Sequence, residues 1–302
     1  CSMSSGVQKS KSVGLVSLFL LSLFVAMITT VPAVTAVNET SSGTITGTET
    51  WTGVMNLDGD LVVAGGAKLI INAGTTINVP ADQNIRIQGS IGAGDSSCGA
   101  SQASTGSPFR FIWGTPPNDP TQTGRCNING VFNPDLACGS GIYLDQTIDQ
   151  SLTKMNHVTL DGAYGIPVDI DGQGTVKYGA LIFDGASLSV TNPSFQDINT
   201  TNVLAFNGAS PTLDGGTFVV GTDGQGYQGA AIQAYGAGAG LVVMQIKNSA
   251  FTGAETDCGT QGGGRSAVYL ENSFVNMDTI SVTQNSYGAF LRSSSGYLTN
   301  ST

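Results

Sequence analysis

Carboxylates, amides, a tyrosine and an arginine occur in two short glycine-rich stretches of this chain, at residues 219–230 and 252–267. The first stretch reads VVGTDGQGYQGA, and the second reads TGAETDCGTQGGGRSA. Carboxylate and amide oxygens are ligands for Ca²⁺, and a few polar groups beside an aromatic ring suit a carbohydrate. We therefore predict a carbohydrate or Ca²⁺ site that comprises Asp223, Gln225, Tyr227, Glu255, Asp257 and Arg265. In the alternative interpretation, the Asp and Gly residues serve only the backbone geometry of two solvated turns.

Two other places contain residue types that are used in catalysis. Asp169 and Asp171, in VDIDG, would lie on one side of an extended strand, where two carboxylates can act as an acid–base pair. Because the phrase ends in Asp-Gly, we favour the interpretation that both are turn residues. His157 is the only histidine and lies beside apolar residues in KMNHVTLDG, so we expect a structural or outward-facing side chain.

A short apolar phrase recurs along the chain and indicates which elements must position these residues. Six copies begin at Gly141, Gly179, Asn202, Gly229, Ser266 and Gly288. In our alignment, the first apolar column contains Ile142, Ala180, Val203, Ala230, Ala267 and Ala289. The second apolar column contains Leu144, Ile182, Ala205, Ile232, Tyr269 and Leu291. Apolar residues two positions apart, with a consistent inward set, indicate half-buried β-strands.

A second phrase follows most copies, with two apolar residues two apart and a third residue five positions later. Its sets are Leu188, Val190 and Phe195; Pro211, Leu213 and Phe218; Met244, Ile246 and Phe251; and Val275, Met277 and Val282. Each unit therefore contains three short strands, and the shortest units extend from Ala180 to Val203 and from Ala267 to Ala289. A short fixed period of this kind indicates a solenoid, in which each strand pairs with its equivalent in the next coil.

The solenoid gives a new meaning to the phrase YGALIFDGASLSV, residues 178–190. On its own, Asp184-Gly185 predicts a tight hairpin, whereas the repeat predicts a corner between strands of different sheets. We expect three stacked pairs, which are Ala180 over Val203, Ile182 over Ala205, and Leu188 near Pro211. The two stretches of the predicted site follow the third strand of consecutive units, so they should emerge side by side.

The run WTGVMNLDGDLVVAGGAKLIINAGTTINV, Trp51 to Val79, resembles the first coils of surface-associated right-handed parallel β-helix proteins of the pectate-lyase-like superfamily. The resemblance covers roughly Thr44 to Thr302. It implies an all-β, right-handed parallel β-helix, a three-faced solenoid with coils of about 22–37 residues.

Many members of this superfamily cleave acidic polysaccharides, but the motifs of the catalytic members are missing from this sequence. The Asn-Thr-Asp and Gly-His-Gly phrases of polygalacturonase-like members do not occur. Pectate-lyase-like members use Ca²⁺ and clustered bases, and only nine scattered Lys and Arg residues follow residue 36. We therefore expect a non-catalytic structural or adhesive protein that binds a glycan, with a polysaccharide lyase or glycoside hydrolase as the alternative.

The N-terminal region has the pattern of an export signal. A polar segment, residues 1–12, contains Lys9 and Lys11 and precedes an uncharged apolar run at 13–36. This run is either a signal peptide that is cleaved after Ala36 or an uncleaved helical membrane anchor. We expect the parallel β-helix to occupy 37–302, with a Cys-containing insertion at about 92–139, and to continue beyond residue 302. The expected location is secreted or at the cell surface.

Composition limits the partners. Only 11% of residues are charged, and the nine bases and 21 acids after residue 36 give a net charge of −12. This charge argues against nucleic acid and favours an extracellular polysaccharide or a cell-surface glycan. We expect membrane contact only through an uncleaved 13–36 segment, and no cofactor, with Ca²⁺ as the one candidate metal ion. Two disulfides are expected from four cysteines, with three pairings open, namely among Cys98, Cys126, Cys138 and Cys258.

Overall fold

The chain forms an all-β structure of stacked parallel strands. The computed structural model describes residues 39–81, 83–93, 109–114, 127–128, 131–132, 140–198, 200–219, 230–236, 240–253, 266–283 and 287–302. These residues form a 17-stranded sheet, a 9-stranded sheet and one small strand pair, and they contain no helix. Accordingly, no helix among them could cross a membrane. The segment 13–36 and the four cysteines of the predicted disulfides lie outside the described residues.

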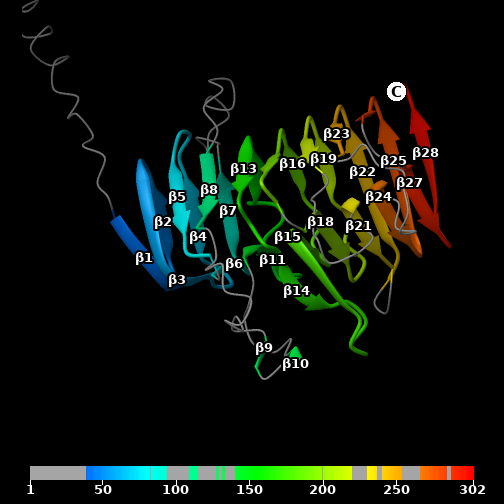
Figure 1. Cartoon of the computed structure of the whole chain (residues 1–302). Coiled ribbons are helices and arrows are strands. Elements are labelled where there is room, and N and C mark those ends of the chain that lie inside the picture. The colour runs from blue at the N-terminus through cyan, green and yellow to red at the C-terminus, as the bar shows by residue number, and fades with distance from the viewer. Residues whose placement is uncertain are drawn as a thin grey trace, which may run out of the picture. The chain divides into compact units, whose positions relative to one another are not determined.

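The strands stack in chain order, as the colours of Figure 1 show, and their pairing defines three ladders. The first ladder follows the second halves of β1 (Glu39–Ile45) and β3 (Val54–Val63), then β6 (Asn84–Ile87), β11 (Gly141–Leu144), β15 (Val176–Asp184), β18 (Thr201–Phe206), β21 (Ala230–Tyr235), β24 (Ser266–Glu271) and β27 (Tyr287–Arg292).

The second ladder is the 9-stranded sheet. It consists of β2 (Thr48–Trp51), β4 (Lys68–Ile71), β7 (Ser90–Ala93), β12 (Lys154–Asn156), β16 (Ser189–Thr191), β19 (Thr212–Asp214), β22 (Val242–Lys247), β25 (Ser273–Asp278) and β28 (Ser295–Thr299). The third ladder follows the first halves of β1 and β3, then β5 (Thr76–Val79), β8 (Phe109–Trp113), β13 (Val158–Asp161), β17 (Ser194–Gln196), β20 (Thr217–Val219), β23 (Ala250–Thr252) and β26 (Ser281–Thr283).

Successive coils confirm the repeat that the sequence predicts. Leu181 pairs with Val203 in the following unit, and Val268 pairs with Ala289 in the same way. The tight hairpin is excluded, because β15 ends at Asp184 and β16 pairs with β12 and β19 rather than with β15. Gly185 has a φ of 64° and forms part of the turn between the two sheets. The molecule is therefore a solenoid-like repeat of parallel strands.

The inner side chains form one continuous hydrophobic core along the coils. In the third ladder, three buried phenylalanines stack face to face across consecutive coils. The ring centroids of Phe195 and Phe218 are 5.3 Å apart, and those of Phe218 and Phe251 are 4.8 Å apart. The register of the second phrase is confirmed throughout, since Val190 pairs with Leu213, which in turn pairs with Ile246.

The register of the first phrase is wrong in three of the six copies. Leu181, not Ala180, lies over Val203, and Phe183, not Ile182, lies over Ala205. In the same way, Val268 and Leu270 occupy the inner columns that our alignment gave to Ala267 and Tyr269, while the Gly229 copy is displaced by two residues because Ile232, not Ala230, pairs with Val203.

The cause is a loss of simple alternation at the start of these strands. Ala180 and Leu181 are neighbours in the chain, yet both belong to the main core, as do Ala231 and Ile232. Side chains on the outer side of the same strands, such as Ile182, are also fully buried. A one-residue slip exchanges the two sides of a strand, and here burial alone does not distinguish them.

The predicted contact between Leu188 and Pro211 is confirmed. Thr212 N–H donates to the Leu188 carbonyl at 3.0 Å, which places Pro211 one step before the start of β19. The missing N–H of this proline therefore falls just outside the paired strand. The Pro211 carbonyl still accepts a hydrogen bond from Gln245 N–H at 3.0 Å, so the ladder continues on its other side.

A column of residues with positive φ forms the corner between the second and third ladders. Its members are His157, Asn192, Gly215, Asn248, Thr279 and Asn300. Each of the first five donates its backbone N–H to a carbonyl in the next coil, for example His157 to Thr191 at 2.7 Å. Asparagine adopts this conformation at lower cost than most residues, which explains its frequency in the column.

The expected extra strand pair in residues 162–177 is also present. β14 (Ile166–Asp169) is antiparallel to the first residues of β15, from Val176 to Gly179. The strand expected at Pro108 to Trp113 is β8, which pairs with β5 and β13 and so divides the predicted insertion at 92–139. Within that insertion, β9 (Asn127–Ile128) and β10 (Val131–Phe132) form a short antiparallel pair.

We predict that Phe218→Ala lowers the free energy of unfolding by about 3–5 kcal/mol, because it removes the middle ring of a buried stack. Urea unfolding of the wild type and the variant measures this loss. Val219→Ala, at the next position with 41% of its side chain exposed, is the matched control and should cost much less. Equal losses in the two variants would show that the Phe stack does not stabilise the coils.

Candidate functional site

The six residues of the predicted carbohydrate or Ca²⁺ site lie outside the described residues, but the ends of their two loops are described. The strands before the loops are neighbours, because Val219 of β20 pairs with Thr252 of β23. The strands after them are also neighbours, because Ala230 of β21 pairs with Ser266 of β24. Both loops therefore leave and re-enter consecutive coils at equivalent positions, as the repeat predicts.

The same strands, β21 and β24, carry aromatic side chains on the outer side of the first ladder. We call Tyr235, Tyr269 and Phe290 the aromatic strip. The ring centroids of Tyr235 and Tyr269 are 5.7 Å apart, and the rings of Tyr269 and Phe290 are parallel within 4° at 5.5 Å. Tyr269 and Phe290 pair across β24 and β27, so their stacking follows directly from the strand register.

Polar groups accompany the strip on each coil. Tyr235 donates its hydroxyl to Gln233 Oε1 at 2.7 Å, and Tyr269 donates to Glu271 Oε2 at 3.1 Å. The other oxygen of Glu271, Oε1, lies 3.6 Å from Arg292 Nη1. Along the first ladder, Glu271 pairs with Arg292, so the carboxylate and the guanidinium stand side by side next to the two stacked rings.

Both tyrosines stay protonated and act as hydrogen-bond donors. Burial raises the pKa of Tyr235, and the nearby Tyr269 and Glu271 raise it further. Burial also raises the pKa of Tyr269, with a further contribution from its hydrogen bond to Glu271. Neither phenol is therefore a base near neutral pH.

The β14 strand pair covers one end of the strip. Ile166 and Ile170 join a second hydrophobic cluster with Leu204, Phe206 and other outer residues of the first ladder. Figure 1 shows this pair in front of β18 and β21. Lys177 Nζ lies 5.2 Å from the ring centroid of Tyr235, which is only 5% exposed.

Exposure then increases toward the last coils, where 46% of Phe290 and 66% of the Arg292 side chain are accessible. The accessible part of the site therefore consists of Tyr269, Glu271, Phe290 and Arg292. Its flat stacked rings, carboxylate and guanidinium can contact the apolar and polar faces of one ligand together.

Two further clusters on the outer side are internally satisfied. Asp184 accepts hydrogen bonds from the Tyr143 hydroxyl and from Asn207 Nδ2, each at 2.6 Å. Asp145 pairs with Arg86, whose guanidinium also lies 5.0 Å from the Tyr143 ring centroid. Burial raises the pKa of Asp145, but the hydrogen bonds from Arg86 and Thr147 outweigh burial and hold this pKa below the ordinary value. These contacts fix the strands rather than leave groups free for a ligand.

The other candidate residues have structural contacts. Asp169 and Asp171 accept backbone hydrogen bonds from the turn at 171–175, which supports the turn interpretation. The hydrogen bond from Thr175 Oγ1, at 2.6 Å, is the main reason that the pKa of Asp171 falls to about 2. His157 lies in the positive-φ corner, with its Nε2 3.3 Å from Asn192 Nδ2. Its predicted structural role is confirmed.

Sequence reasoning missed the aromatic strip. It placed Tyr269 in an inner column, and it did not connect Tyr235 with Phe290. The signal that could have found them is the outward row Gln233, Tyr269 and Phe290, which appears only in the correct register. Among the described residues, no group of three or more His, Cys, Asp or Glu side chains is arranged to hold a metal ion. Comparisons of the chain with family models, curated proteins and solved structures found no match.

The Arg86–Asp145 pair gives a prediction about pH. Because the folded state lowers the pKa of Asp145, its ionised form stabilises the protein above pH 3.8, the ordinary Asp value, and this contribution is lost as the pH falls through the lowered folded pKa. Asp145→Asn should therefore lower the urea midpoint at neutral pH. The difference from the wild type should shrink in acid. A difference that stays constant across this pH range would contradict the assignment.

Proposed function

We propose that this protein is a secreted or cell-surface β-solenoid that binds a glycan through the accessible end of the aromatic strip. The single observation that carries the proposal is the parallel stack of Tyr269 and Phe290 beside the Glu271–Arg292 pair. Pyranose rings have apolar C–H faces and equatorial hydroxyl groups. Stacked aromatic rings with adjacent charged hydrogen-bonding groups match both features.

The fold assignment that accompanies this function is a right-handed, three-faced parallel β-helix of the pectate-lyase-like type. Three ladders of parallel pairs, short coils such as the one from Leu181 to Val203, and one continuous core support it. Right-handedness follows the general rule for parallel crossovers. A rod of this kind holds a site at a fixed distance from its attachment point, which suits an adhesive or structural role.

The two loops at 220–229 and 254–265 enlarge the proposed site. They connect directly to β21 and β24, the strands that carry Tyr235 and Tyr269. We propose that Asp223, Gln225, Tyr227, Glu255, Asp257 and Arg265 add polar contacts to the same glycan or hold a Ca²⁺ ion beside it. The acidic, sparsely charged composition and the export-like 13–36 segment support an extracellular location.

A polysaccharide lyase or hydrolase is the second candidate, and the Glu271 carboxylate next to Tyr269 and Arg292 is the observation that favours it. An acid–base pair would need a proton acceptor with a pKa near the working pH. Tyr269 does not supply one, because its pKa is raised and its hydroxyl already donates to Glu271. Binding without turnover is therefore the better supported function.

We predict that Tyr269→Ala weakens glycan binding at least tenfold, because it removes the central ring of the strip. A glycan array followed by titration calorimetry on the best binder measures the effect. Phe274→Ala is the matched control, since Phe274 is a half-buried aromatic residue of β25 in the 9-stranded sheet. Unchanged affinity in Tyr269→Ala, or no binding of any glycan by the wild type, would sink the proposal.

Turnover distinguishes the two candidates. Acidic and neutral polysaccharides should be incubated with the wild type, with and without Ca²⁺, and the products analysed for cleavage. We expect none. Cleavage that Asp257→Ala abolishes would establish the enzyme in place of the binding protein and would locate its chemistry in the 254–265 loop.

A further inference from the structure

The last coil exposes residues that are buried in every earlier coil. In the first ladder, the inner column that ends at Leu291 contains Val63, Ile87, Leu144, Phe183, Ala205, Ala234 and Leu270, all 0% exposed. Leu291 itself is 44% exposed. In the second ladder, Leu213 and Ile246 are fully buried and Met277 is 7% exposed, whereas Leu298 is 63% exposed.

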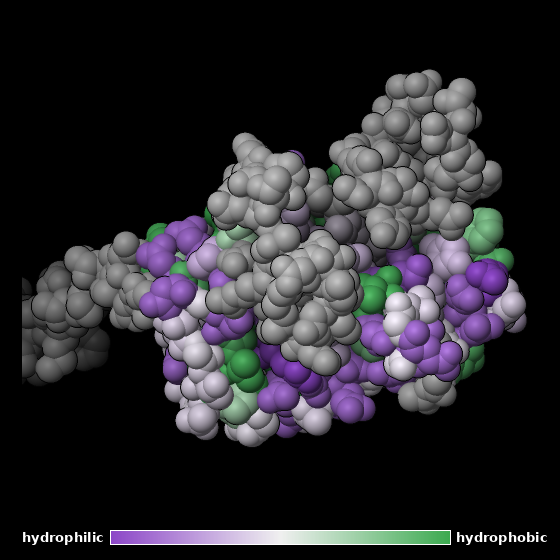
Figure 2. Space-filling model, turned by 60° about the horizontal axis from the view of Figure 1, so that its bottom comes forward, coloured by the Kyte–Doolittle hydropathy of each residue, from purple (hydrophilic) through white to green (hydrophobic). Residues whose placement is uncertain are grey.

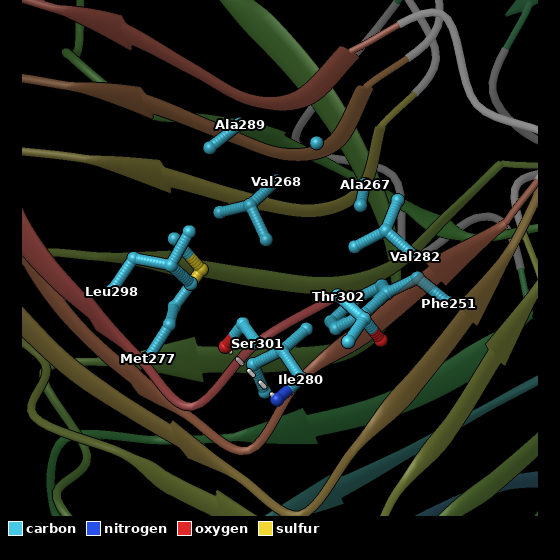
Figure 3. Close-up of a pocket in the computed structure, with 11 residues that line it drawn as sticks. Phe251, Ala267, Val268, Met277, Ile280, Val282, Ala289, Leu298, Ser301 and Thr302 are labelled. Atoms are coloured by element: carbon cyan, nitrogen blue, oxygen red, sulfur yellow. Dashed lines mark hydrogen bonds between the residues drawn. The ribbon is translucent and has the colours of Figure 1, made fainter.

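A cavity of about 180 Å³ lies beneath these two leucines. Figure 3 shows Val268, Met277, Ile280 and Leu298 around it. Because Leu298 is both part of its lining and largely exposed, the cavity belongs to the open end of the core. An apolar space of about 150 Å³ accommodates a benzene ring, so this one can receive a side chain from another molecule. Figure 2 shows hydrophobic surface at the same end, on the right.

The same end also has free strand edges. Within the described residues, β27 pairs only with β24, and β28 pairs only with β25. Unpaired edges beside an exposed core are a strong template for association. We propose that this open end, centred on Leu291 and Leu298, is the contact surface of a two-fold dimer in which two copies of this chain meet end to end.

The chemistry of the two ends selects this arrangement. In the first coil, Ser42, Thr44, Thr48 and Glu49 are exposed, so that end offers hydroxyl and carboxylate groups to a partner. A head-to-tail contact would bury these polar groups against Leu298. A two-fold contact places leucine against leucine, and it turns a free strand edge antiparallel to its own copy, which permits pairing. The contact is isologous and therefore stops at two copies.

Charge also permits the two-fold contact. The only charged residue of β27 and β28 is Arg292, and Glu271 of the same chain lies 3.6 Å from it. Two copies that meet at this end therefore bring no uncompensated group of like charges into the interface. This inference does not depend on glycan binding, since neither Leu291 nor Leu298 belongs to the proposed site.

Sedimentation velocity of the full chain over a wide concentration range tests the proposal. We expect a monomer–dimer equilibrium, and Leu298→Glu should weaken the dimer at least tenfold because it places a carboxylate in the contact. Leu241→Glu is the matched control, because Leu241 is also exposed, at 56%, but lies before β22 rather than at the end. Both variants keep the apolar 13–36 segment, so any association through that segment is common to them.

Leu298 is already largely exposed, so the variant should fold, and an unchanged thermal midpoint verifies this. Leu291→Glu repeats the test from the first ladder and should also weaken the dimer. Three results would overturn the proposal: a wild type that is monomeric at every concentration, equal association in Leu298→Glu and Leu241→Glu, or open-ended filaments instead of a dimer.

Discussion

Parallel stacking of each coil on the next, in register, is the constraint on which the rest of this structure depends. No coil has enough residues to enclose a core, so every inner side chain is buried by the coils before and after it. The Phe195–Phe218–Phe251 stack shows the result, because each ring is covered only by the ring of an adjacent coil. The exposed Leu291 and Leu298 show the converse, since their columns have no further coil to cover them.

Stacking also decides what the corners and the outer side can contain. The corner after the second ladder needs positive φ at one position in each coil, and Asn, Gly, Thr and His157 all occur there. Their backbone hydrogen bonds to the next coil explain why the only histidine serves the fold rather than catalysis. On the outer side, the inter-strand spacing brings Tyr269 and Phe290 into parallel contact, so the proposed binding surface is a by-product of the same register.

The repeat made much of the fold predictable. The second phrase gave the correct register because its inner residues, such as Val190 and Leu213, alternate with exposed polar ones. The first phrase failed at Ala180 and Ala267, where consecutive residues are both buried and the β14 pair covers the outer side nearby. The equivalent placement of the two loops followed from gap lengths alone, whereas the aromatic strip depended on the register that the sequence could not resolve.

By itself, the sequence determined the all-β class, the repeat length, the corners at Asp184-Gly185 and Asn207-Gly208, and the turn role of Asp169 and Asp171. These features depend on local backbone preference and on apolar spacing, which can be read within about one unit of the chain. Only the tertiary structure decided which of two neighbouring residues faces the core, and therefore that Tyr269 stacks outward beside Phe290 and Arg292. The physical reason is that a strand buried on both sides loses the polar alternation that marks its faces.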